Sequence, residues 1–149
     1  MRPWGVRAFL SLLIRPATTA DIERINALEY ELFPDNSLSC VMLERELAVS
    51  QVFVEGDPLH AYAIVGHDGE LLDLLRLGVD TTQQGRGAGT RLLLHTLSLA
   101  QPMMLTVRKN NARALRLYRK HGFEVIGHFS EKASWVMRWE PAAADGPSR

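Results

Sequence analysis

The stretch Gln84-Gly85-Arg86-Gly87-Ala88-Gly89-Thr90 decides how this chain is interpreted. It follows an apolar run, Leu71 to Val79, and opens a leucine-rich run, Leu92 to Leu99. A strand, a glycine-rich turn and a helix in this order leave unpaired backbone N–H groups at the helix N-terminus, where the helix dipole also favours negative charge. Glycines allow positive φ angles and close approach of a ligand to the backbone. The stretch therefore predicts a site for a phosphate-bearing ligand.

The glycine pattern by itself does not identify the ligand. Gly89 is followed by Thr90 and Arg91, so the Gly-Lys-Ser/Thr ending of a P-loop is missing. Glycines alternate at Gly85, Gly87 and Gly89, which differs from the G-x-G-x-x-G pattern of dinucleotide-binding proteins. A left-handed glycine turn that binds nothing is the competing interpretation of this stretch alone.

Three segments together resemble the GNAT family of acetyltransferases. Gln84-x-x-Gly87-x-Gly89 is similar to the family's loop for the acetyl-CoA pyrophosphate, and Leu77-Gly-Val-Asp80 stands just before it. The segment from Leu105 to Phe123 resembles the second half of the family's domain. The resemblance is closest to the ribosomal-protein alanine N-acetyltransferase branch. It implies an α/β (α+β) fold with a mixed central sheet flanked by helices, and a splayed parallel strand pair at an acetyl-CoA site.

The periodicity of the chain predicts the same order of elements. Thr18-x-x-Asp21 is a helix-start signal, and Gly122 stands where a left-handed residue ends a helix. We expect an N-terminal extension over residues 1–13, an acetyltransferase domain over 14–140 and a disordered tail over 141–149. Expected strands are 14–17, 51–55, 59–65, 71–79, 103–108, 123–127 and 134–139, with a turn over 67–70 and helices from Asp21, over 39–48, over 89–100 and over 111–121.

Composition narrows the functional classes. The 149 residues carry 17 basic and 17 acidic side chains, so nothing predicts bulk electrostatic binding to nucleic acid or membrane. The single cysteine, Cys40, excludes an internal disulfide and fits a reducing cytoplasm; we expect it to be a small buried side chain. The five histidines show no metal-ligand spacing, so no metal is expected. A monomer or a homodimer is expected.

Acetyl transfer from a thioester needs a polarised carbonyl, a neutral amine and a proton for the departing thiolate. The resemblance implies that main-chain groups of Leu77 and Val79 hold the pantetheine arm, with the Val79 N–H facing the thioester. Ordinary sheet pairing of these groups is the alternative. The family resemblance also implies that residues Gln84 to Thr90 bind the pyrophosphate.

Tyr118 is the candidate general acid. It lies seven positions after Asn111, so both residues share one helical face. A phenol has an ordinary pKa of about 10, close enough to a thiol to protonate a thiolate. The alternative is a core tyrosine with its hydroxyl paired. Asn111 can contact the pantetheine arm, cap the helix, or do both.

The general base is less defined. The alanine N-acetyltransferases carry a glutamate where this chain has Thr106, which cannot act as a base near neutral pH. Asp73 is the other candidate, because it shares an otherwise apolar, inward-facing strand face with Leu75, Leu77 and Val79. A simple position at the solvated start of the strand is an equal alternative for Asp73.

The expected function is acetyl-CoA-dependent transfer of an acetyl group to a primary amine, on a protein N-terminus or a small molecule, by direct attack in a ternary complex. A non-catalytic acyl-CoA-binding sensor is the alternative, favoured by the missing strand glutamate and opposed by Tyr118. Acceptor recognition is expected around Phe33 to Ser39 and Gly127 to Lys132. Arg76 and Arg108 are expected to contact an acidic acceptor, a phosphate or solvent.

Overall fold

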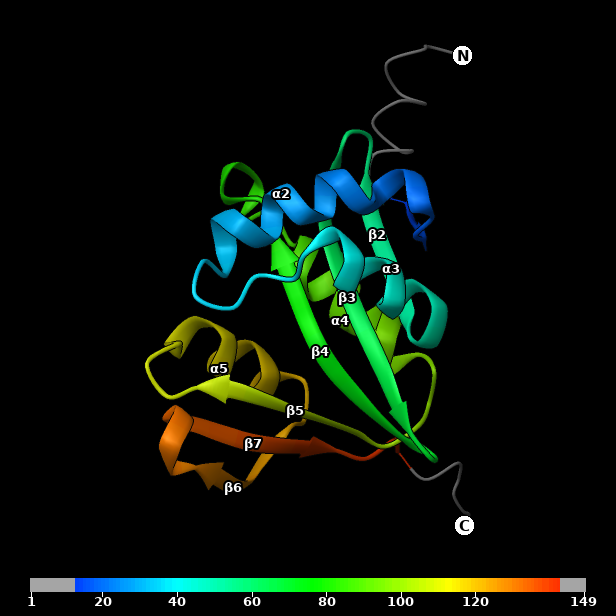
Figure 1. Cartoon of the computed structure of the whole chain (residues 1–149). Helices are drawn as coiled ribbons and strands as arrows, with labels where there is room; N and C mark the ends of the chain where they lie inside the picture. The colour runs from blue at the N-terminus through cyan, green and yellow to red at the C-terminus, as the bar shows by residue number, and fades with distance from the viewer. Residues whose placement is uncertain (1–12, 143–149) are drawn as a thin grey trace. The chain divides into compact units, whose positions relative to one another are not determined.

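The computed structural model describes residues 13–142 (Figure 1). Its strands form a seven-stranded mixed sheet in the order β1-β2-β3-β4-β5-β7-β6. The elements in chain order are β1 Ile14–Pro16, η1 Thr19–Asp21, α2 Ile22–Leu32, α3 Cys40–Val49, β2 Gln51–Gly56, β3 Leu59–Asp68, β4 Leu71–Val79, η2 Thr81–Gln83, α4 Ala88–Leu97, β5 Met103–Arg108, α5 Ala112–Lys120, β6 Glu124–Phe129, η3 Ser130–Lys132 and β7 Ser134–Trp139.

The chain divides into two compact units, and each is described by itself. The first contains residues up to 66 together with 75–96, and the second contains 67–74 together with the residues from 97 on. The first unit therefore holds β1, β2, α2, α3, α4 and nearly all of β3, with the end of β4. The second holds β5, β6, β7 and α5, with the start of β4.

In the first unit, β2 pairs antiparallel with both β1 and β3. Val52 and Val54 of β2 join a core cluster with residues of α2 and α3, so these two helices cover one face of the strands (Figure 1). Phe53 points the other way and meets the His95 ring of α4 edge-on, with ring centroids 4.6 Å apart. Period-two alternation along β2 thus places α4 on the opposite face from α2 and α3.

In the second unit, β5 pairs antiparallel with β7, and β7 pairs antiparallel with β6. The start of β4 runs parallel to β5, with Leu72 opposite Met103 and Asp73 opposite Met104. α5 follows β5 and ends at Lys120, and Gly122 just beyond it has a φ of 96°, the left-handed conformation that favours glycine.

The predicted α/β architecture and the parallel pair in the middle of the sheet are confirmed. β3 is longer than predicted and ends at Asp68, because backbone pairing sets the end of a strand whatever the polarity of its last side chains. α4 ends at Leu97, earlier than predicted, and Ala100 then takes a left-handed φ of 58°. Except for Leu13, the predicted extension 1–13 lies outside the described residues, as does most of the predicted tail.

Candidate functional site

The glycine-rich turn lies in the first unit, between the end of β4 and the start of α4. Gly85 and Gly87 have φ angles of 81° and 90°, which residues with a Cβ rarely adopt. The side-chain Nε2 of Gln84 donates to the main-chain oxygen of Val79 at 3.1 Å, which ties the turn back to β4. The predicted glycine turn therefore exists, and it leads directly from strand to helix.

The first main-chain donors of α4 are available to a ligand. The N–H of Arg91 donates to the carbonyl of Gly87 at 2.9 Å. Within residues 13–142, no main-chain acceptor pairs with the N–H groups of Ala88, Gly89 or Thr90. These donors stand at the positive end of the helix dipole, so they suit a phosphate group.

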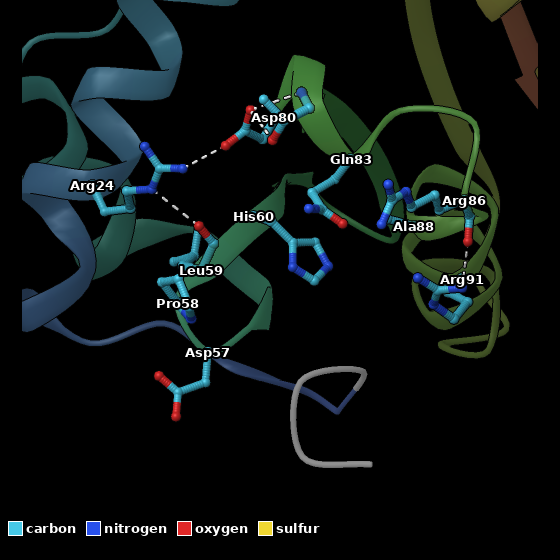
Figure 2. Close-up of a pocket in the computed structure, with 11 residues that line it drawn as sticks. Arg24, Asp57, Pro58, Leu59, His60, Asp80, Gln83, Arg86, Ala88 and Arg91 are labelled. Atoms are coloured by element: carbon cyan, nitrogen blue, oxygen red, sulfur yellow. Dashed lines mark hydrogen bonds and ion pairs between the residues drawn. The ribbon is translucent and has the colours of Figure 1, made fainter. Parts of the chain in front are cut away.

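A pocket of about 520 Å³ lies beside this turn, within the first unit (Figure 2). Its wall combines the β2–β3 connection, the first turns of α2 and α4, and the segment after β4. It carries cationic side chains from three elements together with two carboxylates. The lining residues are Arg24, Asp57, Pro58, Leu59, His60, Asp80, Thr82, Gln83, Arg86, Ala88 and Arg91.

Asp80 organises the segment between β4 and the turn. Its carboxylate accepts hydrogen bonds from the Thr82 N–H and hydroxyl, each at 3.0 Å, and from Arg24 Nη2 at 2.6 Å. Its own N–H donates to the His60 carbonyl at 2.8 Å. The Thr82 N–H above all, then the Thr82 hydroxyl and Arg24, lowers the pKa of the Asp80 carboxyl. Asp80 is thus held ionised where the chain leaves the sheet.

Glu55 is a fully buried carboxylate behind the glycine turn. It accepts from Arg91 Nε at 2.6 Å and Arg91 Nη2 at 3.1 Å, and its Oε2 lies 2.8 Å from His60 Nε2. The neighbouring Gly56 leaves room for the imidazole, because a Cβ there would lie 2.3 Å from His60 Nδ1. We name Glu55, His60 and Arg91 the Glu55 cluster.

Glu29 is a second fully buried carboxylate of the first unit. It accepts from the Tyr62 hydroxyl at 2.5 Å, from Arg76 Nε at 3.1 and 3.2 Å, and from the Leu38 N–H at 2.9 Å. Burial, and then the hydrogen bond and the charge of Glu29, raise the pKa of the Tyr62 phenol far above its ordinary range. We name Glu29, Tyr62 and Arg76 the Glu29 cluster.

The Glu29 cluster fixes the connection between α2 and α3. Arg76 Nη2 donates to the Asn36 carbonyl at 2.6 Å, and its guanidinium lies 4.5 Å from the centroid of the Phe33 ring. Glu29 holds the Leu38 N–H of the same connection. The segment predicted to recognise the acceptor is therefore held by Arg76 of β4 and by Glu29 of α2.

Tyr118 lies on α5 of the second unit and is 8% exposed. Its ring packs against Phe123, with centroids 5.6 Å apart. Within the described chain, no residue forms a hydrogen bond with its hydroxyl, so the predicted alternative of a paired core tyrosine lacks a partner. Burial raises the pKa of Tyr118 to about 12.

Asn111 caps α5, since its side-chain oxygen accepts from the Ala114 N–H at 3.1 Å. This confirms the capping alternative and leaves the pantetheine contact as a prediction. At the other end of the helix, the N–H groups of His121 and Phe123 both donate to the Tyr118 carbonyl. The backbone around Tyr118 is therefore fixed by the end of the helix.

Asp73 lies at the start of β4 in the second unit. The face of β4 that carries it is the more exposed one, with Leu75 41% exposed, whereas Leu72 and Leu74 are buried. The expectation that this face points inward is therefore wrong. Partial burial, and then the charge of Asp68, still raise the pKa of Asp73. Thr106 is an exposed residue of β5 opposite Val136 of β7.

The other residues named from the sequence differ in their exposure and contacts. Leu77 and Val79 are partly buried in β4, and Arg86 is exposed. Arg76 was expected to contact an acceptor, a phosphate or solvent; it pairs with buried Glu29. Cys40 is exposed at the first residue of α3, so its predicted burial is wrong.

Sequence reasoning missed both glutamate clusters. Glu29 could have been found, because it falls at helical spacing with Ile22, Ile25 and Leu32 on the buried stripe of α2. Glu55 gave no such signal, since its partners come from other elements and only tertiary structure brings them together.

Residues 13–142 contain no helix that is long and apolar enough to cross a membrane. Within the same range, no three His, Cys, Asp or Glu side chains converge as metal ligands would.

Residues 40–125 match the acetyltransferase (GNAT) domain family. N-alpha-acetyltransferase RimI of Mycobacterium tuberculosis is 36% identical over 121 residues, which cover 74% of this chain and 77% of that protein. The uncharacterized protein ML0378 of Mycobacterium leprae is also 36% identical, over 127 residues. That alignment covers 78% of this chain but 35% of the Mycobacterium leprae protein, so the chain spans about a third of that relative's length.

Solved structures share the fold. The ribosomal-protein-S18-alanine N-acetyltransferase of Escherichia coli gives a TM-score of 0.76 at 20% identity, over 92% of this chain and 98% of that one. PaiA N-acetyltransferase of Thermoplasma acidophilum, solved in complex with coenzyme A, gives 0.75 at 18% identity, over 87% and 99%. The family match over more than half of the sequence and the RimI relative show that this chain belongs to the GNAT family of acetyltransferases.

Proposed function

We propose that this protein is an acetyl-CoA-dependent N-acetyltransferase that modifies a primary amine by direct attack in a ternary complex. The observation that carries the proposal is the glycine turn before α4, where the N–H groups of Ala88, Gly89 and Thr90 have no main-chain partner among residues 13–142. Such a row fits the pyrophosphate of coenzyme A. The PaiA N-acetyltransferase with the same fold was solved with coenzyme A bound, which supports this choice of ligand.

The cosubstrate would supply the activated acetyl group as a thioester. We assign its pyrophosphate to residues Gln84 to Thr90 and its pantetheine arm to main-chain groups of Leu77 and Val79 and to Asn111. The Val79 N–H would stabilise the negative charge that develops on the thioester oxygen. These groups bind and orient, and a backbone donor at that position needs no proton transfer of its own.

Tyr118 is the proposed general acid. A buried hydroxyl without a partner costs on the order of 1–3 kcal/mol, which a hydrogen bond to a bound ligand would offset. Its raised pKa of about 12 keeps the phenol protonated at neutral pH, as donation to a thiolate requires.

Asp73 is the proposed general base, directly or through a water molecule. Partial burial raises its pKa, which brings the carboxylate closer to useful basicity. Thr106 leaves the other customary position without a base.

The acceptor is a protein N-terminus or a small amine. The RimI relative supports a protein N-terminus as the acceptor. The absence of the strand glutamate at Thr106 favours a wider range of acceptor amines. We place acceptor recognition in the segment 33–39, which the Glu29 cluster fixes, and in 127–132. A cytoplasmic location is proposed from the single cysteine and the bacterial relative.

The test is a calorimetric titration with acetyl-CoA followed by a transfer assay against peptides and small amines. Gly87→Glu provides the matched variant, because a Cβ at this φ of 90° would lie 2.9 Å from Arg91 Nη1 and the new carboxylate would repel phosphate. We expect binding by the wild-type chain and none by the variant. Unchanged affinity in a folded Gly87→Glu protein would refute the site.

A non-catalytic acyl-CoA sensor is the second candidate, favoured by the absence of a glutamate at Thr106. A sensor would bind acetyl-CoA in the same titration, yet transfer no acetyl group to any amine tested at any pH. Transfer to even one amine at a rate above the uncatalysed reaction would exclude it.

A further inference from the structure

Arg91 uses every guanidinium nitrogen to join two parts of the first unit. Nε and Nη2 bind the buried carboxylate of Glu55. Nη1 donates to the main-chain oxygen of Arg86 at 3.0 Å (Figure 2). Glu55 belongs to β2, whereas Arg86 lies within the glycine turn. The side chain therefore connects strand β2 to the glycine turn.

The orientation of Arg91 is fixed by its surroundings. Glu55 is fully buried and takes a two-pronged contact from the guanidinium, and His60 holds the same carboxylate from another side. The hydrogen bond that Arg91 donates to Glu55 is the main cause of the raised pKa of Arg91. The guanidinium also packs on Gly87, where any Cβ would lie 2.9 Å from Nη1.

This contact sets the direction of one peptide group in the turn. The Arg86–Gly87 peptide is trans, so its N–H points opposite to its C=O. Because the carbonyl points to Arg91, the Gly87 N–H must point away from the guanidinium. A flip of this peptide changes φ of Gly87, which glycine tolerates, and Arg91 is the side chain that opposes the flip.

We propose that Glu55 and Arg91 are positioning residues that hold the Arg86–Gly87 peptide with its N–H directed toward the pyrophosphate of coenzyme A. The inference rests on the proposed function and deepens it. Arg91 then acts through the backbone and not as a cation on the phosphate. Releasing the carbonyl lets the peptide rotate, so one donor to the ligand is lost and the turn must be ordered on binding.

The experiment measures the dissociation constant of coenzyme A by calorimetry for wild type, Arg91→Lys and Glu55→Gln. Arg91→Lys keeps the positive charge but cannot bind Glu55 and the Arg86 carbonyl at the same time. Glu55→Gln keeps the size of the side chain but removes the charge that orients the guanidinium. We expect both to weaken binding by about 10- to 100-fold, the loss of one charge-assisted hydrogen bond. The double variant should be no weaker than the worse single one.

Arg15→Lys is the matched control. It is the same substitution at another two-pronged arginine–carboxylate pair of the first unit, because Arg15 Nη1 and Nη2 bind Asp21 at 2.8 and 2.9 Å, and Arg15 is not among the residues that line the pocket. We expect its affinity to stay within about twofold of wild type. Turnover with S-acetylpantetheine, which has no pyrophosphate, should be equal in all variants, because the released peptide serves only that group.

The outcomes separate the inference from the function on which it rests. A wild-type chain that does not bind coenzyme A overturns both. Wild-type binding with full affinity in Arg91→Lys and in Glu55→Gln overturns the positioning role alone. If Arg91→Met loses affinity for coenzyme A while Glu55→Gln keeps full affinity, Arg91 contacts the phosphate directly. That result also overturns the positioning role. Circular dichroism and thermal melting confirm folding, and Arg91→Lys carries the test if Glu55→Gln does not fold.

Discussion

Two buried tyrosines stand in opposite chemical situations. Tyr62 of the first unit is 0% exposed, and its hydroxyl donates to the carboxylate of Glu29 at 2.5 Å. Tyr118 of the second unit is 8% exposed, and no residue between 13 and 142 bonds to its hydroxyl. Proteins seldom bury a polar group unpaired, because the loss of water costs free energy. The paired phenol therefore contributes to the fold, whereas the unpaired one is available to a ligand.

The largest effect is expected from Tyr118→Phe. Removal of the proposed general acid should lower kcat by about 10²- to 10⁴-fold, with acetyl-CoA affinity nearly unchanged. Stability should stay the same or rise slightly, because the lost hydroxyl has no partner in the part of the chain that the structure describes. Single-turnover kinetics check the expected loss of rate, and thermal melting checks the expected stability. Wild-type kcat in this variant would make Tyr118 a packing residue.

Tyr62→Phe should give the reverse. The buried carboxylate of Glu29 loses a donor, and hydrogen bonds to charged groups contribute roughly 1.5–3 kcal/mol. We expect unfolding by urea at a correspondingly lower midpoint, with much less loss of kcat than in Tyr118→Phe. A variant as stable as wild type would show that Arg76 and the Leu38 N–H satisfy Glu29 without the phenol.

Gly78→Ala tests how closely the Tyr62 ring is packed. A Cβ at position 78 would lie 2.7–2.8 Å from atoms of that ring, and overpacking of this kind costs typically about 1–3 kcal/mol. The smaller side chain of Tyr62→Leu should remove the clash, so the two substitutions should be strongly non-additive. Additive losses in a double-mutant cycle would contradict the contact. Gly69→Ala cannot serve as a neutral control, because its φ of 65° strains any Cβ.

The smallest effect concerns pH and sharpens the role of Tyr118. The pKa of Asp73 is raised, so as the pH falls its carboxylate becomes protonated at a higher pH than that of an ordinary aspartate. A protonated Asp73 cannot accept a proton, so kcat/KM should drop on the acidic side. The acid role proposed for Tyr118 requires the protonated phenol, and a pKa of about 12 keeps it protonated across the usual assay range. We therefore expect an acidic limb, absent in Asp73→Asn, and no basic limb from Tyr118. An identical acidic limb in Asp73→Asn would exclude Asp73 as the base.

The sequence predicted the local features of the fold well. The bounds of β4, β5 and β7 follow from apolar runs between breakers, and the capping roles of Thr18 with Asp21 and of Asn111 depend on neighbours a few residues away. The glycine turn was found because positive φ leaves a compositional trace.

Long-range contacts left no such trace. The bond between Tyr62 and Glu29 joins residues 33 positions apart, and the pair of Arg91 with Glu55 joins residues 36 apart. Periodicity says which residues are buried but not which buried polar groups meet. The exposure of Asp73 and Cys40 was missed for the same reason, because it depends on which neighbours cover each element.

Cys40 gives the chain a natural place for a spectroscopic reporter. It is the single cysteine of the sequence, it is exposed, and it directly follows the segment that Arg76 and Glu29 hold. A maleimide dye would therefore attach at one defined point without any engineering. Its anisotropy would follow that segment in real time as amines are added, and Arg76→Met would show how far the segment moves once it is released.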